Sequence, residues 1–397
     1  MQFRVGVNGH VEKRLSRLVE HAKKISPEYA VRLDGIRGEG VGERLGQLPV
    51  LTRDQLRDII SGLTVRPQGR CARMLHTSGS SGQPLNLPAT AAEIRTDALL
   101  WLNVYRRLGL RAWHRQAKFV FGNPFPPHWV QRLSWYRRMY CPATACPSEK
   151  VAWLRETRPQ AVFGWASLLG EVARDLESQN ERLRIPLIFS SSDMLWAGLR
   201  RQIADRLGGR VFDIYGAVET GPLAWECPVG GGYHVCADHV ILEILDDANR
   251  PARRGRIVST VLWRWSVPLI RYEMGDVGEW ETDPCPCGRP WPRLRRLHGR
   301  CSNLLQLAGG EWFSWGILED ILHGVDSIGQ FQFVRKSADL ICLRLARQKS
   351  FTSDDEKMIC RRFDALFKGR LKLRVEIVPP WQPKAGSKFQ PFVVLAK

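Results

Sequence analysis

The sequence has no run of about 18 apolar residues, the shortest length that reads as a helix across a membrane. Its first residues, Met1 to Arg4, do not combine a cationic segment with an apolar core, so we do not expect a secretion signal. Ten cysteines in 397 residues do not make a disulfide scaffold and instead indicate reduced thiols or metal ligands. These absences predict a cytoplasmic protein without a membrane span.

Acidic residues are few relative to basic ones: 40 against 59, for a net charge of +19. Such a charge attracts an anionic partner, which could be a nucleotide, CoA, an acidic carrier protein or nucleic acid. The arginines occur in scattered pairs, which is typical of a solvated basic surface. Most of the 15 tryptophans stand among apolar residues, so we expect them in cores and do not expect nucleic acid as a partner.

The apolar pattern predicts an α/β fold. Early helices are expected over 11–25, 53–60 (with Thr52 as its N-cap) and 91–108, with a short strand at 73–75. Between residues 116 and 215, short apolar segments alternate with helices, which indicates a parallel sheet covered by helices. We expect these strands at 116–121, 161–163, 186–189 and 211–215, and these helices over 168–176 and 195–207.

The pattern changes after Glu226. Strands without intervening helices are expected at 239–245, 256–263 and 268–272, which indicates an antiparallel β subdomain over about 226–300. A separate α+β unit follows, with a hairpin around Gly309–Gly310, helices over 315–322 and from 353, and strands at 331–335, 340–345 and 371–378. We therefore predict a large mixed domain over 1–300 and a small α+β domain over 301–397.

Three polar clusters lie beside the expected strands. Glycines and hydroxyl residues fill the stretch 77–84, and such a loop can bring backbone and side-chain donors together around a phosphate. A flexible serine–glycine linker has the same composition. The other two clusters are 190–193 and 215–220, and they follow strands of the parallel sheet, where ligands bind in this class of fold.

Five motifs in order resemble the adenylate-forming superfamily of acyl-CoA synthetases, luciferases and adenylation domains. They are the loop 77–84, Tyr215-Gly216-x-x-Glu219, Gly275-Asp276, Gly299-Arg300 and the C-terminal Lys388. The opening 48–52, Glu226-Cys227 and the later Cys-x-Cys look most like the phenylacetate–CoA ligase branch, which includes relatives from capsular-polysaccharide clusters. The resemblance covers nearly the whole chain, and it implies that 301–397 is a mobile lid domain.

The resemblance implies an AMP-forming ligase that uses ATP and Mg²⁺ to make an acyl-adenylate from a carboxylic acid and then transfers the acyl group. Glu219 would bind Mg²⁺, Asp276 the ribose hydroxyls, Arg300 the ribose or phosphate, and Lys388 the α-phosphate and carboxylate. Tyr215 would stack beside adenine. The other implied nucleotide-binding residues are Thr77, Ser78, Gly79, Ser80, Ser81, Gly82, Ser191, Ser192, Asp193, Asp213 and Gly216.

The sequence departs from the family pattern at two places, of which the first would weaken a phosphate contact and the second, in the hinge, concerns the acceptor. Gln83 stands where the loop commonly has lysine, and Cys301-Ser302-Asn303 replaces the usual acidic residues of the hinge. We expect CoA as the acceptor, with an amine, a hydroxyl or an acidic carrier protein as the alternative. Aromatic residues near 163–165, 189 and 215–217 favour an aryl or other apolar acid. Monomer and homodimer both stay open.

The β subdomain contains four residues of metal-ligand type, since Cys227 and His234 are followed at a distance by Cys285 and Cys287. Three thiolates and one imidazole suit a closed structural Zn²⁺ site, and some relatives in this branch carry similar cysteines with zinc. Cys236 and His239 are rival ligands, and four unconnected residues are the simpler alternative. A rival function of another class is a basic, zinc-containing nucleic-acid-binding protein, which would explain the charge and cysteines but not the five ordered motifs.

Overall fold

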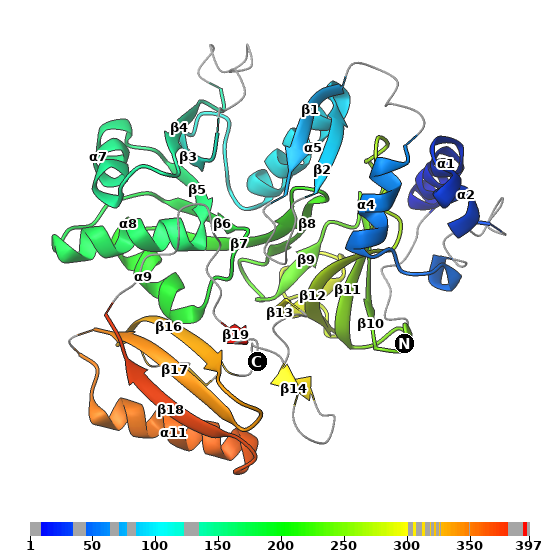
Figure 1. Ribbon diagram of the computed structural model, residues 1–397. Coiled ribbons are helices and arrows are strands. Elements are labelled where there is room, and N and C mark those ends of the chain that lie inside the picture. The colour runs from blue at the N-terminus through cyan, green and yellow to red at the C-terminus, as the bar shows by residue number, and fades with distance from the viewer. Residues whose placement is uncertain are drawn as a thin grey trace. The chain divides into compact units, whose positions relative to one another are not determined.

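The computed structural model describes residues 9–34, 45–63, 71–77, 85–122, 135–300, 305–306, 312–313, 318, 321–322, 325, 327–348, 350–379 and 392–394. The chain divides into two compact units (Figure 1): residues 1–108 with 214–301, and residues 109–213 with 302–397. Among the described residues, no helix is long and apolar enough to cross a membrane. The α/β fold class is as predicted; the two-domain boundary at residue 300 stays a prediction.

The first unit begins with helices. They are α1 (Gly9–Ile25), α2 (Pro27–Arg32), the 3₁₀ turn η1 (Leu45–Gln47) and α4 (Arg53–Ser61). Thr52 caps α4, because its hydroxyl accepts from the amide of Gln55 while the Gln55 side chain returns to the amide of Thr52. The antiparallel pair β1 (Cys71–His76) and β2 (Asn86–Thr90) follows, and α5 (Ala91–Arg107) begins at a second capping box on Thr90.

The rest of the first unit is an antiparallel sheet. Its strands are the end of β7 (Arg210–Ala217), β8 (Gly221–Glu226), β9 (Tyr233–Val235), β10 (Val240–Leu245), β11 (Arg254–Val261), β12 (Tyr272–Glu281) and β13 (Arg293–Arg300). The pairs run β10–β11–β12–β13–β9–β8–β7. The buried apolar face of this sheet packs with α1, η1 and α4 in one core.

One expected strand of this sheet is wrong. The segment 268–272 is not a strand, because β12 begins at Tyr272 and continues to Glu281. Arg271 has a φ of +50°, and its guanidinium is buried against Glu243, with Nε 3.0 Å from Glu243 Oε2. Leu269 and Ile270 are buried in the core, which explains why an irregular segment has the apolar character of a strand.

The second unit contains the parallel strands. They are β3 (Gln116–Val120), β4 (Arg138–Pro142), β5 (Ala161–Trp165), β6 (Leu187–Ser191) and the start of β7. β3 pairs in parallel with β4 and β5, and β5 pairs in parallel with β6. The helices are α7 (Pro147–Thr157), α8 (Ala166–Ser178) and α9 (Ala197–Leu207), and apolar side chains of all three join the sheet core. The expected parallel, helix-covered sheet is confirmed.

The C-terminal residues of the second unit form a four-stranded sheet. Its strands are β16 (Ile328–Arg335), β17 (Leu340–Arg347), β18 (Lys372–Ile377) and β19 (Phe392–Val394), in the order β18–β17–β16–β19. α11 (Ser353–Phe367) supplies Ile359, Phe363 and Phe367 to its core. The short strands β14 (Leu305–Gln306) and β15 (Trp312–Phe313) pair antiparallel around the expected hairpin. Of the expected helix 315–322, residues 318, 321 and 322 are described, and they are helical.

Candidate active site

Glu219 lies in the turn between β7 and β8, on a tight hairpin of the first unit. A Cβ on Gly216 would come within 2.5 Å of the carbonyl oxygen of Gly221, so only glycine permits this approach. The buried Arg264 donates from Nε to the carbonyl of Glu219 at 3.0 Å. These contacts fix the turn and leave the Glu219 carboxylate 6% exposed, with Tyr272 Oη 3.5 Å from its Oε1.

The ends of the serine–glycine loop are joined by hydrogen bonds. The amide of Thr77 donates to the carbonyl of Leu85 at 3.1 Å, and the amide of Leu85 donates to Thr77 Oγ1 at 2.9 Å. Residues 78–84 between them lie outside the described residues, so the contacts predicted for Ser78 to Gly82 and for Gln83 stay predictions. The described residues at either end, Thr77 and Leu85, are thus joined by two hydrogen bonds.

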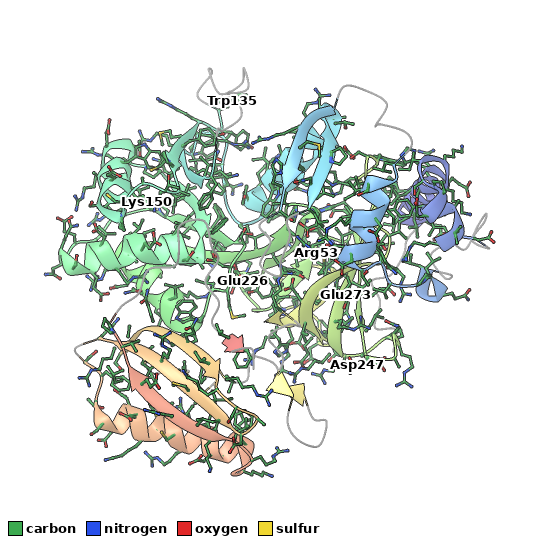
Figure 2. All side chains as sticks on the ribbon, viewed as in Figure 1. Arg53, Trp135, Lys150, Glu226, Asp247 and Glu273 are labelled. Carbon is green, nitrogen blue, oxygen red and sulfur yellow. The ribbon has the colours of Figure 1, made fainter. Side chains whose placement is uncertain are left out.

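Arg53 connects the loop base to Glu219. Its Nη2 donates to Thr77 Oγ1 at 2.7 Å, and its Nη1 lies 3.8 Å from Glu219 Oε1 (Figure 2 labels Arg53). The sequence analysis did not identify this residue. The available signal was its place directly after the N-cap of α4, which holds it at a helix start.

Asp276 and Arg300 form an ion pair across two strands. They are opposed residues of β12 and β13, and Arg300 Nε lies 3.3 Å from Asp276 Oδ1. Arg300 Nη1 also donates to the carbonyl of Met274 at 3.0 Å. Gly275, which lies between Met274 and Asp276 in β12, has a φ of +72°. A Cβ at this position would lie 3.3 Å from Arg300 Nη1. The Asp276 carboxylate raises the pKa of Arg300 against the opposing effect of burial, so this guanidinium stays charged.

Tyr215 is held by the same carboxylate. Its hydroxyl donates to Asp276 Oδ2 at 2.8 Å. A second tyrosine, Tyr272, was missed from the sequence because it was assigned to the end of a strand. Burial above all, and then the nearby Glu219 carboxylate, raise the pKa of Tyr272, so its phenol remains a neutral donor. The first unit therefore holds Tyr215, Asp276 and Arg300 in one cluster, and Thr77, Arg53, Glu219 and Tyr272 in another.

The other predicted nucleotide-binding residues belong to the second unit. Asp193 accepts from the first amides of α8, at 2.7 Å from Ala166 N and 3.2 Å from Ser167 N, so its carboxylate stabilises a helix start. Ser192 has a φ of +80°, and Asp213 is half-buried in β7. The assignment of Ser191, Ser192, Asp193 and Asp213 to the nucleotide stays a prediction. Cys301, Ser302 and Lys388 lie outside the described residues.

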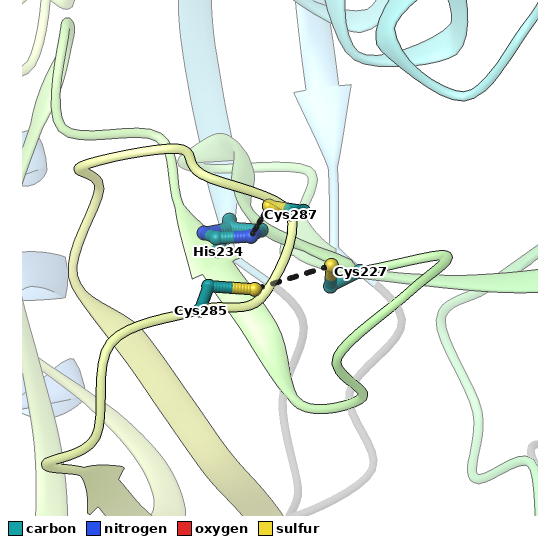
Figure 3. A group of neighbouring side chains, drawn as sticks. All are labelled: Cys227, His234, Cys285 and Cys287. Atoms are coloured by element: carbon teal, nitrogen blue, oxygen red, sulfur yellow. Dashed lines mark hydrogen bonds between the residues drawn. The ribbon is translucent and has the colours of Figure 1, made fainter.

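The predicted metal ligands come together in the first unit (Figure 3). The donor atoms of Cys227, His234, Cys285 and Cys287 all lie within 4.8 Å of one another. Cys227 Sγ is 3.5 Å from Cys285 Sγ, and Cys287 Sγ is 3.3 Å from His234 Nε2. These separations are the size of the edges of a tetrahedron with Zn–S and Zn–N bonds of about 2.3 and 2.1 Å. The donor set and its geometry fit Zn²⁺.

The surroundings hold the His234 ring in place. His234 is fully buried, and its ring lies 4.9 Å from that of Trp225. Burial above all lowers the pKa of His234, which favours the neutral imidazole that a metal requires. The rival ligands are used elsewhere: His239 has one ring nitrogen 2.9 Å from the carbonyl of Pro222 and the other 3.0 Å from Asp238. Among the described residues, Cys236 and His239 are not part of the four-ligand group.

The fold is similar to that of adenylate-forming CoA ligases of known structure. No family model matches the chain. A solved structure of 2-hydroxyisobutyryl-CoA ligase in the postadenylation state, in complex with 2-HIB-AMP, is similar with a TM-score of 0.82 and 21% identity. That likeness covers 98% of this chain and 91% of the other.

The sequence relatives narrow the class. The phenylacetate–coenzyme A ligase of Thermus thermophilus is 27% identical over 319 residues, which are 75% of this chain and 71% of the relative. The enzyme of the same name from Pseudomonas putida is 27% identical over 336 residues, 79% of this chain and 75% of the relative. These relatives and the solved structure support the resemblance of the chain to the adenylate-forming superfamily, phenylacetate–CoA ligase branch. The resemblance drawn from the five motifs is confirmed. The relatives are CoA ligases, so they support an enzyme and not the rival function of a nucleic-acid-binding protein.

Proposed function

We propose that the protein activates a carboxylic acid with ATP and transfers the acyl group to CoA. The observation that carries the proposal is the arrangement in the first unit, where the loop base at Thr77 is bound through Arg53 to Glu219. In the same unit, Asp276 and Arg300 form an ion pair beside Tyr215. The first group would bind the phosphates of ATP and the second its ribose. Two relatives named phenylacetate–coenzyme A ligases align with 75% and 79% of the chain.

The ribose end is assigned to Asp276. An ionised carboxylate can accept two hydrogen bonds at once, as the two ribose hydroxyls of ATP would require. Tyr215 and Arg300 already donate to its two oxygens, which orients the carboxylate before the nucleotide arrives. When the nucleotide binds, either Tyr215 or Arg300 can turn to a ribose or phosphate oxygen, while the other one of the two stays bound to Asp276.

The phosphate end is assigned to the 77–84 loop and Glu219. Arg53 holds the loop base and adds positive charge next to it. Mg²⁺ on Glu219 would supply a hard cation that withdraws charge from the phosphates. In the first step a carboxylate oxygen of the acid forms a bond to the α-phosphorus, and the bond to the bridging oxygen breaks, so pyrophosphate leaves with the electron pair. Lys388 is assigned to stabilise the charge on the reacting oxygens.

The second step is transfer to the acceptor. The CoA sulfur attacks the acyl carbonyl, the thiol proton is lost, and AMP leaves with the electrons of the broken mixed-anhydride bond. Gln83 and Ser302 depart from the family pattern in the loop and the hinge, so amine, hydroxyl and carrier-protein acceptors are tested beside CoA.

The acid is assigned to the aryl or other apolar class. Phe163 and Phe189 are buried and stack on each other, with ring centroids 4.9 Å apart. Trp165 is only partly buried, and its ring centroid lies 4.6 Å from that of Phe121, so it has surface left for a substrate.

A structural Zn²⁺ is assigned to Cys227, His234, Cys285 and Cys287. Cys227 directly follows β8, whose first residues complete the Glu219 turn. The metal would fix one end of that strand and so support the turn at its other end. This role is structural, since all four ligand positions would be taken by protein.

The experiment is to incubate the protein with ATP, Mg²⁺ and each of a set of aryl and short aliphatic acids and to analyse the products by mass spectrometry. Acyl-AMP without an acceptor, and acyl-CoA when CoA is added, are the expected products. Acyl-AMP that disappears only with an amine or a carrier protein would overturn the CoA assignment. No acyl-AMP from any acid would overturn the proposed function.

A further inference from the structure

The second unit concentrates arginine at the edge of its sheet where the strands begin. Parallel strands start at one edge, and backbone hydrogen bonds join the segments that lead into them. Gln116 N donates to Arg137 O at 2.8 Å, and Leu187 N donates to Gln160 O at 3.2 Å. Six exposed arginines lie on these segments: Arg111, Arg137, Arg158, Arg182, Arg184 and Arg210.

We call this surface the arginine edge; it consists of residues 111–115, 135–137, 158–160, 182–186 and 208–210. None of these segments contains Asp, Glu or Lys. Of the flanking carboxylates, Asp205 pairs with Arg182 at 3.0 Å and Glu181 pairs with Arg155, while Glu156 is exposed two residues before Arg158. The edge is therefore a strongly positive strip, and its charge comes from guanidinium groups alone.

Two tryptophans are exposed on the same edge. The side chain of Trp113 is 72% exposed and that of Trp135 is 59% exposed. Figure 2 labels Trp135, which precedes β4. The amide of Tyr136 donates to the carbonyl of Ala112, so the two segments lie side by side. Exposed indoles next to arginines offer flat apolar faces between positive charges.

A hollow of about 750 Å³ opens at the other end of the edge. Arg182, Arg184 and Arg210 line it together with Leu183, Pro186 and Asp205. Its walls thus combine guanidinium groups and apolar surface with the Asp205 carboxylate, which pairs with Arg182. The dimensions suit one or two nucleotide units instead of a single small anion.

We propose that the arginine edge binds single-stranded nucleic acid without reading its base sequence. A guanidinium forms two parallel hydrogen bonds with a phosphate, which a lysine cannot do. Five neighbouring strand starts spaced about 4.8 Å apart make a row roughly 20 Å long, which fits a chain of phosphates. Indole faces stack on unpaired bases, and a duplex would hide those faces. This binding is separate from the ligase reaction and does not depend on it.

The test is fluorescence anisotropy of a labelled 20-mer of thymidylate with the full chain, at 50 to 200 mM salt. Arg182 is paired with Asp205, which leaves five exposed arginines (Arg111, Arg137, Arg158, Arg184 and Arg210) for phosphate contacts. Five contacts with a single strand predict a slope of log K against log salt of about −3.5. Replacing Arg111, Arg158 and Arg184 by Glu should weaken binding at least tenfold and flatten the slope by about 2. Trp113→Ala with Trp135→Ala should weaken binding with the slope unchanged, because stacking releases no counterions.

The matched control replaces Lys357, Arg361 and Lys372 by Glu, which changes the net charge equally on exposed positions of α11 and β18. It should lose less than threefold in affinity, and circular dichroism should be the same for both variants. Equal weakening by both triple variants would mean a bulk charge effect and would overturn the proposal. Tighter binding to heparin, or to vesicles rich in phosphatidylserine, than to the 20-mer would assign the edge to another partner and also overturn it.

Discussion

Asp276 and Arg300 are directly opposed on β12 and β13, with Arg300 Nε 3.3 Å from Asp276 Oδ1. The Gly-Asp and Gly-Arg motifs, which are distant in sequence, are thus a single cross-strand pair. A change of one residue in this register would turn one of the two side chains to the other face of the sheet. The register of these two strands therefore determines whether the proposed nucleotide site can form.

Asp276→Asn should raise the KM for ATP about 10- to 100-fold, because hydrogen bonds to a charged group contribute about 1.5–3 kcal/mol each. The amide keeps the size of the carboxylate but cannot accept from both ribose hydroxyls while holding Arg300. Steady-state kinetics with varied ATP measures the change. Asp247→Asn is the control, since Asp247 is exposed in the turn between β10 and β11. A KM within twofold of the wild type would remove Asp276 from the nucleotide site.

Arg53→Ala should raise the KM for ATP about tenfold and speed hydrogen exchange at the Leu85 amide. The Thr77 hydroxyl loses its guanidinium donor, so the base of the 77–84 loop is less firmly held. Arg53→Lys should restore part of the KM for ATP and part of the slow exchange at the Leu85 amide. An ammonium keeps the charge but cannot bridge two partners in one plane. Arg57→Ala, one turn along α4, should leave the KM for ATP and the exchange at the Leu85 amide unchanged, since Arg57 pairs with Asp54. Normal exchange in Arg53→Ala would show that the loop base does not need this contact.

Zinc should be present at about one atom per chain in protein purified without added metal. Cys287→Ser should lose the metal and lower the melting temperature, because binding to the folded state alone stabilises it. A strong chelator should lower the melting temperature of the wild type to that of the variant and leave the variant unchanged. Cys146→Ser is the control, as Cys146 is exposed and outside the four-ligand group. A wild type without metal would contradict the zinc assignment.

Stability should fall in acid through His298. Burial above all, and then Arg254 and Arg296, lower the pKa of His298 to about 3 from its usual 6.5. The unfolded chain therefore takes up a proton below about pH 6.5 that the folded chain refuses. The stabilisation is complete above pH 6.5 and is lost as the pH falls towards 3.

Urea unfolding at several pH values between 4 and 7 measures this effect. One proton corresponds to a slope of up to about 1.4 kcal/mol per pH unit. His298→Gln should flatten the pH dependence by up to that amount, whereas His10→Gln, at an exposed position, should not. Equal pH dependence in wild type and His298→Gln would contradict the assignment.

The sequence predicted elements whose signal is local. Apolar periodicity predicted α1, α8 and α11, and the Thr52 side chain caps α4 as expected. The failures came from long-range structure. The buried Arg271 converts an apolar segment into a turn, and that turn is built by contacts with Glu243, which is distant in the chain. The strands β8, β9 and β13 were missed because pairing with neighbouring strands defines them and their composition does not.

The residues of the candidate site also fall into those with a local sequence signal and those defined by long-range contacts. Glu219, Asp276 and Arg300 were found because each stands in a short motif whose order resembles a known family. Arg53 and Tyr272 were missed because their relevance comes from distance, 3.8 Å and 3.5 Å to the Glu219 carboxylate. The exposure of Trp113 and Trp135 was also unreadable, since a tryptophan among apolar residues is usually buried.

The most direct test of the central claim is the exchange of labelled pyrophosphate into ATP with a set of carboxylic acids. We predict exchange that requires both an acid and Mg²⁺, is strongest with aryl or other apolar acids, and is largely lost in Asp276→Asn but kept in Asp247→Asn. Exchange that is independent of acid, or absent with every acid tested while the protein is folded, would contradict the account of this chain as an acid-activating ligase.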